Sequence, residues 1–114
     1  IPELEVLGDK DADTLMVGWG GTFGHLYTTL DELRTEGKKI ALAHFNYIKP
    51  LPKNSYEVLK KYKKIVVCEL NAGQFANYLR MNYPDIPLLQ YNKVQGAPFT
   101  VIELKKHITN LLEA

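Results

Sequence analysis

The stretch that decides the fold is Leu15-Met16-Val17-Gly18-Trp19-Gly20-Gly21-Thr22-Phe23-Gly24-His25. Residues 15–18 are typical of a buried strand, and the glycines after them indicate a turn that leads into a helix. Parallel α/β domains place their ligand or partner loops at junctions of this kind. The functional question for the whole chain is therefore whether this turn holds a phosphate, a catalytic group or a neighbouring subunit.

Composition narrows the class of protein. The 114 residues suffice for a single domain, residues 1–114, and are too few for two. The 46% hydrophobic content and net charge of +1 are ordinary for a soluble globular protein and favour neither nucleic acid nor membrane as a partner. No apolar run approaches the roughly 20 residues that span a bilayer, and no signal peptide is recognisable. Because Cys68 is the one cysteine, an internal disulfide is excluded, and we expect a cytoplasmic protein.

Strand patterns alternate with helix patterns along the chain. We expect strands at residues 1–7, 15–18, 40–43, 65–68 and 87–91, the first of them an edge strand. We expect helices from Phe23 to a stop at Gly37, from Asn54, from Phe75 to Asn82, and from Thr100 onward. This alternation predicts a parallel or mostly parallel sheet with helices on both faces.

Side-chain patterns add detail to the helices. The first helix carries an apolar stripe that we expect in the core, made of Phe23, Leu26, Tyr27, Leu30 and Leu33. Capping boxes are expected at Asn54 with Glu57 and at Thr100 with Glu103. In the last helix we expect His107 to face solvent, and an apolar stripe to face the core at Val101, Leu104, Ile108 and Leu111.

The glycine turn matches known phosphate-binding loops only in part. A dinucleotide-binding G-x-G-x-x-G fingerprint would need glycine in place of Phe23 and an acidic residue after the next strand, where the chain has His44-Phe45-Asn46. A Walker A loop is excluded because no Gly-Lys-Ser/Thr sequence follows. Two interpretations stay open: the backbone amides of residues 20–24 hold an anion, or glycine only lets strand and helix pack closely.

Other chemistry-bearing side chains give weak signals. His25 and His44 follow adjacent strands and could approach each other, but no carboxylate or thiolate at fixed spacing completes a metal site. Cys68 lies in a buried apolar run, where a thiol is normally inert. The lysines at 60, 61, 63 and 64 suit a helix C-terminus better than a nucleic-acid surface, because no aromatic residues are arranged to stack bases.

A second polar loop, Glu69-Leu70-Asn71-Ala72-Gly73-Gln74, follows the strand at 65–68. Polar groups at the C-terminal end of a central strand face the crevice in which α/β sheets bind ligands. Asn71 can equally cap the following helix, with Glu69 as an ordinary satisfied carboxylate. The residues alone leave cap and binding site as equal alternatives.

Four segments, in order, resemble one family. They are residues 18–24 (GWGGTFG), 44–52 (HFNYIKPLP), 67–74 (VCELNAGQ) and 91–96 (YNKVQG). From about Pro2 to the final helix, the chain resembles the C-terminal domain of the alpha subunit of 2-oxoglutarate:ferredoxin oxidoreductase. The resemblance implies a three-layer α/β/α fold like the transketolase C-terminal domain, with a five-stranded mixed sheet of order 1-3-2-4-5 and an antiparallel first strand. In that order, the loops at 18–24 and 69–74 flank one crevice.

The resemblance also implies a function. The family's full enzyme oxidatively decarboxylates a 2-oxoacid, transfers the acyl group to coenzyme A and reduces ferredoxin, using thiamine diphosphate, magnesium and an iron–sulfur cluster. Its partners would be the other domains of the alpha subunit and the beta subunit. One cysteine cannot hold a cluster, and no pyrophosphate- or Mg²⁺-binding motif is recognisable. We therefore expect a catalytically silent domain without metal ligands, excised from a longer subunit, as the start at Ile1 without methionine also indicates.

The crevice loops supply the candidate site. Docking against the thiamine-binding domains is the favoured role, and binding of an anion such as a phosphate of coenzyme A is the lesser one. The alternative is a free-standing flavodoxin-like module that binds a phosphate-bearing small molecule. The candidate residues are Gly20, Gly21, Thr22, Gly24, His25, Asn46, Glu69, Asn71, Gly73 and Gln74.

Overall fold

The computed structural model places the predicted strands in one sheet and describes residues 1–70, 72–93 and 97–114. The elements in chain order are β1 (Val6–Gly8), β2 (Thr14–Trp19), a short 3₁₀ helix η1 (Gly20–Thr22), α1 (Phe23–Thr35), β3 (Ala41–Phe45), α2 (Ser55–Leu59), β4 (Lys64–Glu69), α3 (Gln74–Asn82), β5 (Leu89–Asn92) and α4 (Val101–Glu113). None of the described helices is long and apolar enough to cross a membrane.

The sheet has the order β1-β3-β2-β4-β5. Strand β1 runs antiparallel to β3, with Val6 opposite Ala43, and the other neighbouring strands run parallel. The expected mixed sheet of order 1-3-2-4-5 is therefore confirmed. A flavodoxin-like sheet has five parallel strands in the order 2-1-3-4-5, so the antiparallel edge strand separates this fold from that alternative.

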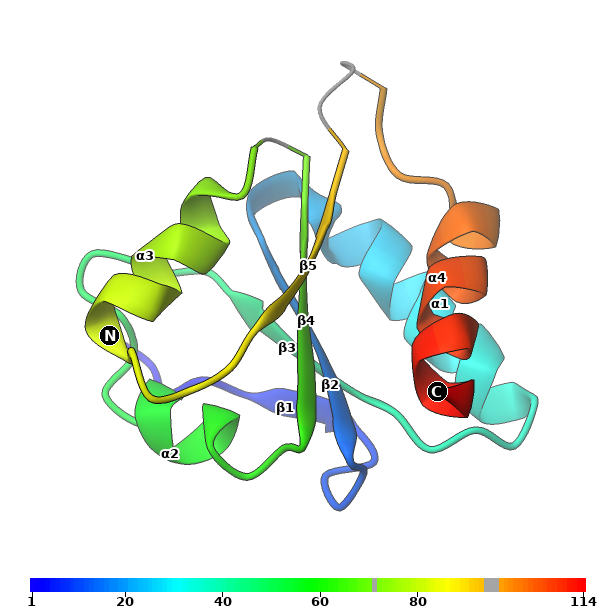
Figure 1. Cartoon of the computed structure of the whole chain (residues 1–114), viewed down its shortest axis with the longest axis horizontal. Helices are drawn as coiled ribbons and strands as arrows, with labels where there is room; N and C mark the ends of the chain where they lie inside the picture. The colour runs from blue at the N-terminus through cyan, green and yellow to red at the C-terminus, as the bar shows by residue number, and fades with distance from the viewer. Residues whose placement is uncertain (71, 94–96) are drawn as a thin grey trace.

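The helices form a layer on each face of the sheet (Figure 1). Helices α1 and α4 cover one face, where Leu26 and Leu104 pack with Met16 and Val66 of the sheet. Helices α2 and α3 cover the other face, and their apolar residues pack against Leu15, Val17, Ile65 and Val67. Because successive strand residues point to opposite faces, the continuous apolar runs of β2 and β4 contribute side chains to the cores on both faces of the sheet.

The first strand is shorter than predicted. The expectation was a strand over residues 1–7, but β1 contains only Val6–Gly8. A side chain holds the segment before it: Asn54 Oδ1 accepts from the backbone N–H of Leu4 at 2.7 Å, and Asn54 Nδ2 donates to the Leu4 carbonyl at 3.0 Å. The predicted capping box at Asn54 is therefore wrong, because its side chain makes no cap hydrogen bond and Glu57 pairs with Lys60 instead.

The core face of α1 also differs from the prediction. Leu26, Leu30 and Leu33 are buried as expected, but Phe23 and Tyr27 are 40% and 49% exposed. Helical spacing placed all five on one stripe, yet the buried face of α1 does not include the two aromatic side chains. The stop at Gly37 is confirmed: its φ is +85°, a left-handed conformation that glycine adopts without strain.

The C-terminal part matches the prediction more closely. The capping box of Thr100 with Glu103 is present, and Leu104 and Ile108 are buried. Strand β5 begins two residues later than expected and continues to Asn92. The prediction that His107 faces solvent is wrong, because its ring stacks on Tyr91 of β5 with centroids 3.9 Å apart.

Candidate functional site

The two predicted loops meet at one edge of the sheet. Strands β2 and β4 are parallel neighbours, paired through Val17 and Val67, and end at Trp19 and Glu69. Residues 20–24 and the described part of 69–74 therefore leave the sheet side by side. The Trp19 ring also contacts Phe75 of α3, with centroids 5.7 Å apart. The predicted junction at the carboxyl edge of the central strands is thus present.

The glycine turn is closely packed at Gly18 and open to solvent at Gly20 and Gly21. A Cβ on Gly18 would lie 2.8 Å from Thr22 Oγ1 and 3.3 Å from His44 Nδ1, so close packing requires glycine there. The buried Thr22 hydroxyl donates to the Trp19 carbonyl at 3.1 Å, which ties the turn together. Gly20 and Gly21 are exposed, and a Cβ on either would meet nothing within 4 Å. Anion binding by their amides stays a prediction.

The loop after β4 is built as a helix cap. The Glu69 carboxylate is fully buried, and its two oxygens accept from the backbone N–H groups of Phe75 and Ala76, each at 2.8 Å. These are orphan donors of the first turn of α3. Gly73 has a φ of +87° and lies against Gln90 of β5. Asn71 lies outside the described residues, so Glu69 is the cap that the structure shows.

The other candidate residues are dispersed along this edge. Gly24 and Gln74 are exposed on α1 and α3, and His25 is half-buried, its carbonyl accepting from Thr29. Asn46 is exposed after β3 and lines a pocket of about 160 Å³ with His44 and Tyr47. Within the described residues, no group of three or more His, Cys, Asp or Glu side chains is placed to hold a metal ion.

The His44 side chain packs at the carboxyl edge of the sheet, beside the glycine turn. Its ring meets the Phe23 ring edge-on, with centroids 5.1 Å apart. Nδ1 is buried and finds no hydrogen-bond partner among the described residues. Burial lowers the pKa of His44 below its ordinary value. The neutral imidazole is therefore the form that this packing favours.

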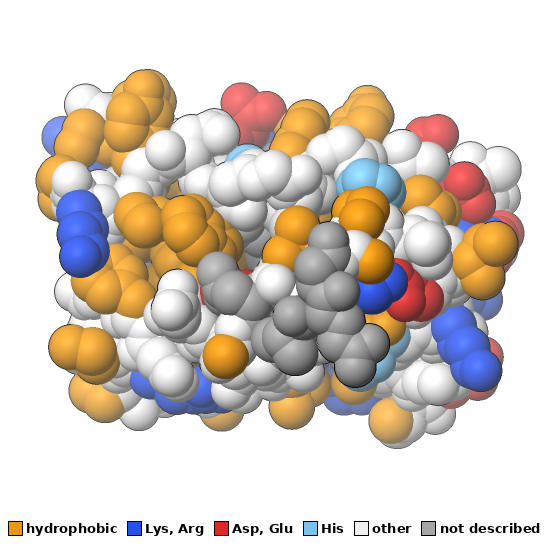
Figure 2. All heavy atoms as spheres, turned by 90° about the horizontal axis from the view of Figure 1, so that it is seen from above, with side chains coloured by type: hydrophobic (Ala, Val, Ile, Leu, Met, Phe, Trp, Pro, Cys, Tyr) orange, Lys and Arg blue, Asp and Glu red, His pale blue; other side chains and the backbone are white. Residues whose placement is uncertain are grey.

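Exposed apolar side chains at this edge are the feature that the sequence did not indicate. Phe23, Tyr27, Tyr47 and Leu70 are large and at least 39% exposed. Figure 2 shows hydrophobic side chains in several patches on the face onto which β2 and β4 open. Apolar spacing assigned Phe23 and Tyr27 to the core, and Tyr47 and Leu70 lie in predicted loops without an apolar pattern that would mark them as a surface. Large exposed apolar patches mark interaction surfaces.

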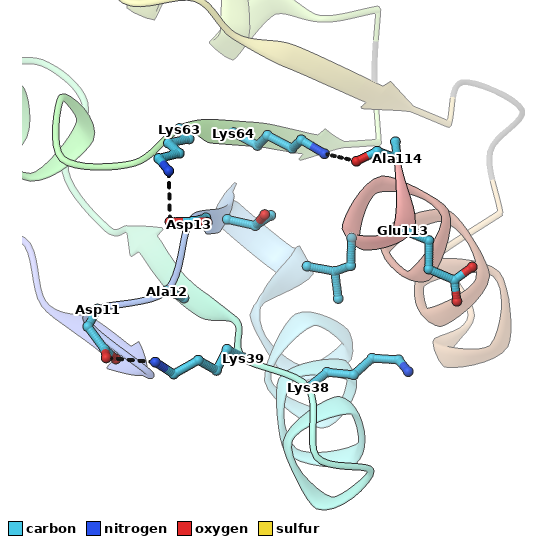
Figure 3. Close-up of a pocket in the computed structure, with 11 residues that line it drawn as sticks. Asp11, Ala12, Asp13, Lys38, Lys39, Lys63, Lys64, Glu113 and Ala114 are labelled. Carbon is cyan, nitrogen blue, oxygen red and sulfur yellow. Dashed lines mark hydrogen bonds and ion pairs between the residues drawn. The ribbon is translucent and has the colours of Figure 1, made fainter.

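A wider pocket, of about 620 Å³, opens at the opposite edge of the sheet (Figure 3). Three of its four lysines have partners within the chain: Lys39 pairs with Asp11, Lys63 approaches Asp13, and Lys64 Nζ donates to the Leu111 carbonyl at 2.7 Å. Lys64 thereby ties the start of β4 to the end of α4. These pairings give three of the pocket's lysines a structural role.

The family of the chain follows from a match over most of its length. Residues 12–104 match the family described as pyruvate:ferredoxin oxidoreductase core domain II. The chain belongs to this family. The match begins before β2 and ends within α4, so the glycine turn, the Glu69 cap and the carboxyl edge all lie within core domain II.

Similar proteins are subunits of larger enzymes. The 2-oxoglutarate oxidoreductase subunit KorA of Mycobacterium tuberculosis is 38% identical over 109 residues, which are 95% of this chain and 16% of KorA. A solved 2-oxoglutarate:ferredoxin oxidoreductase from Magnetococcus marinus, with 2-oxoglutarate, coenzyme A and succinyl-CoA bound, aligns with a TM-score of 0.89 and 26% identity over 98% of this chain and 20% of that one. The expected resemblance is confirmed, and this chain corresponds to a small part of each relative.

A third similarity concerns the fold alone. The alpha chain of a probable 2-oxoacid ferredoxin oxidoreductase from Thermoplasma acidophilum aligns with a TM-score of 0.68 and 23% identity over 98% of both chains. That solved chain thus has nearly the same extent as this one. The chain itself has a core on each face of its sheet, which is the buried apolar layering of a domain.

The residues present do not fit the cofactors that the resemblance implies. An iron–sulfur cluster is held by several thiolates. The chain has one cysteine, Cys68, and burial raises the pKa of its thiol to about 12. The described residues also offer no acidic or histidine cluster for Mg²⁺. Among the described residues, the single buried cysteine and the absence of such a cluster do not match the ligand sets of these groups.

Proposed function

We propose that this chain is a non-catalytic structural domain of the alpha subunit of a 2-oxoglutarate:ferredoxin oxidoreductase. The observation that carries the proposal is the 0.89 TM-score with the Magnetococcus marinus enzyme over 98% of the chain. The 38% identity to KorA supports 2-oxoglutarate as the substrate. On this proposal, residues 1–114 form one domain of a longer cytoplasmic subunit, since each of these relatives extends far beyond the matched region.

The proposed reaction belongs to the complete enzyme. The bond between C1 and C2 of 2-oxoglutarate breaks and C1 leaves as carbon dioxide. The remaining acyl group forms a thioester with the coenzyme A sulfur, the thiol proton is released, and two electrons pass to ferredoxin. Thiamine diphosphate with magnesium and an iron–sulfur cluster would be held by other domains and the beta subunit, because the side chains described above do not fit them.

The role proposed for this domain is structural rather than catalytic. Two of its polar loop residues are engaged in its own fold: Glu69 caps α3, and the Thr22 hydroxyl closes the glycine turn. Large apolar side chains and glycine backbone are exposed at the carboxyl edge, together with the polar side chains of Asn46 and Gln74. Such an edge suits packing against a neighbouring domain better than it suits acid–base or nucleophilic chemistry.

The proposal is tested on the full-length protein, purified with the subunits that accompany it. Reduction of a viologen dye, as a stand-in for ferredoxin, is measured with 2-oxoglutarate and coenzyme A. We expect reduction that requires both compounds, with succinyl-CoA as the product identified by mass spectrometry. Residues 1–114 alone serve as the control and should reduce no dye.

Pyruvate provides the discriminating substrate, because the family takes its description from a pyruvate enzyme. Dye reduction with pyruvate but not with 2-oxoglutarate would refute the substrate assignment. No reduction with either 2-oxoacid would refute the proposed activity, and turnover by residues 1–114 alone would refute the non-catalytic role.

A further inference from the structure

Two aromatic side chains of α1 lie side by side on the surface. Phe23 and Tyr27 are one helical turn apart, and their rings stack with centroids 5.7 Å apart and an interplanar angle of 27°. Both are more than one-third exposed, although each carries enough apolar area for a core position. Exposing two stacked rings on one helix face leaves apolar surface in water that a partner can cover.

The apolar surface continues across the end of β3. Phe23 contacts His44 edge-on, and His44 shares the 160 Å³ pocket with Tyr47, which is 46% exposed. These residues come from two of the four sequence segments that carry the family resemblance. We call Phe23, Tyr27, His44 and Tyr47 the aromatic surface.

Acidic side chains border the aromatic surface. Glu3 and Glu5 are exposed and line the same pocket as His44 and Tyr47. Among the described residues, neither carboxylate forms an ion pair, whereas most acidic groups elsewhere in the fold have a lysine or arginine partner. A partner that covers the rings would therefore bring these carboxylates a cation.

We propose that the aromatic surface docks a neighbouring domain of the same subunit, through apolar side chains set against Phe23, Tyr27 and Tyr47 and a lysine or arginine set against Glu3 and Glu5. This inference rests on the proposed function, because the relatives' chains extend far beyond the region that this chain matches. Aromatic residues are enriched at the centres of interfaces, with charged groups at the rim, which is the arrangement found here.

A second copy of the chain fits this surface less well. A two-fold contact places the same patch on both partners. The aromatic surface contains no lysine or arginine, so the same surface on a second copy supplies no cation of its own for Glu3 and Glu5. A neighbouring domain of different sequence has no such constraint.

Hydroxyl-radical footprinting of two samples tests the inference. The samples are residues 1–114 alone and the full-length protein, and labelling is read by mass spectrometry. We expect Phe23, Tyr27 and Tyr47 to be labelled in the isolated chain and to fall, in the full-length protein, to the low level of the buried Phe45 and Phe75. Met81 and Ile102, which are 79% and 82% exposed on other helix faces, serve as the reference for residues outside this surface.

A variant pair separates docking from folding. Tyr27→Ser with Tyr47→Ser should leave the isolated chain folded, because both side chains are half in solvent, but should speed protease cleavage between the domains of the full-length protein. Met81→Ser with Ile102→Ser is the matched control and should leave cleavage unchanged.

Three results of these experiments would overturn the docking proposal. Equal labelling of the aromatic surface in both samples would overturn the proposal, as would equal cleavage of the two variants. Loss of labelling in the isolated chain as its concentration rises would assign the surface to a second copy and overturn it too. Because footprinting needs no turnover, a failure of docking is distinguishable from a failure of the proposed 2-oxoglutarate activity.

Discussion

Glu69 caps the helix that begins five residues after it, through hydrogen bonds of 2.8 Å to the backbone N–H groups of Phe75 and Ala76. The carboxylate is fully buried at the end of β4, so both of its oxygens are used inside the protein. Glu69 was a candidate binding-site residue of the second polar loop, and these hydrogen bonds give it a structural role. It fixes α3 against the sheet without help from solvent.

Removing this cap should be costly. Glu69→Ala leaves two buried N–H groups without acceptors, and we expect it to lower the free energy of unfolding by about 3 kcal/mol. Glu69→Gln keeps one acceptor oxygen and should lose roughly half as much. Urea unfolding of the isolated chain measures both. A loss below about 0.5 kcal/mol for Glu69→Ala would contradict the cap.

The two halves of the glycine turn should respond differently to alanine. Gly18→Ala places a methyl group against Leu26 and Thr22, so we expect a loss of about 1–3 kcal/mol in unfolding free energy. Gly21→Ala enters open space and should change stability by less than about 0.5 kcal/mol. Equal losses at the two positions would show that the turn is packed throughout, contrary to the structure.

Asn54 tests a contact that replaces the predicted capping box. Asn54→Ala removes both hydrogen bonds to Leu4 and should lower the unfolding free energy by about 1–2 kcal/mol. Glu57→Gln should cost less than about 0.5 kcal/mol, because the ion pair that Glu57 forms among the described residues, with Lys60, is exposed. If Glu57→Gln were the more damaging change, the capping box would be restored as the explanation.

His107 should make stability depend on pH. Burial against Tyr91 lowers the pKa of His107 in the folded state below its ordinary value of 6.5. The unfolded chain then binds the proton more readily, so stability is complete above pH 6.5 and falls as the pH drops through the folded-state pKa. His107→Phe keeps the stacked ring but cannot titrate, and should weaken the loss between pH 7 and pH 5. Burial also lowers the pKa of His44, so some pH dependence should remain in the variant. An unchanged pH dependence would refute the assignment to His107.

Local patterns predicted the parts of the fold that local physics determines. The apolar runs at β2 and β4, the stop at Gly37 and the capping box at Thr100 depend on residues within a few positions of one another. The antiparallel placement of the first strand came from the family resemblance. The length of β1 was not predicted correctly, because it depends on a distant contact. Asn54, which is 50 residues from Leu4 in the sequence, hydrogen-bonds the Leu4 backbone in place of a longer strand pairing.

The candidate site was harder to predict because its features depend on tertiary neighbours. The family resemblance predicted that residues 18–24 and 69–74 flank one crevice, and the parallel pairing of β2 with β4 brings the described parts of these loops to the same edge. The sequence could not show that Thr22 and Glu69 are used internally. Nor could helical spacing show that Phe23 and Tyr27 face outward, since apolar residues for a core and for a partner look alike in a single sequence.

The central claim, that this domain packs against others and holds no thiamine cofactor itself, is tested most directly by titration calorimetry. Thiamine diphosphate with Mg²⁺ is titrated into residues 1–114, whose folding is confirmed in the same sample by circular dichroism. We predict no saturable heat of binding. A saturable isotherm with micromolar affinity would contradict the claim.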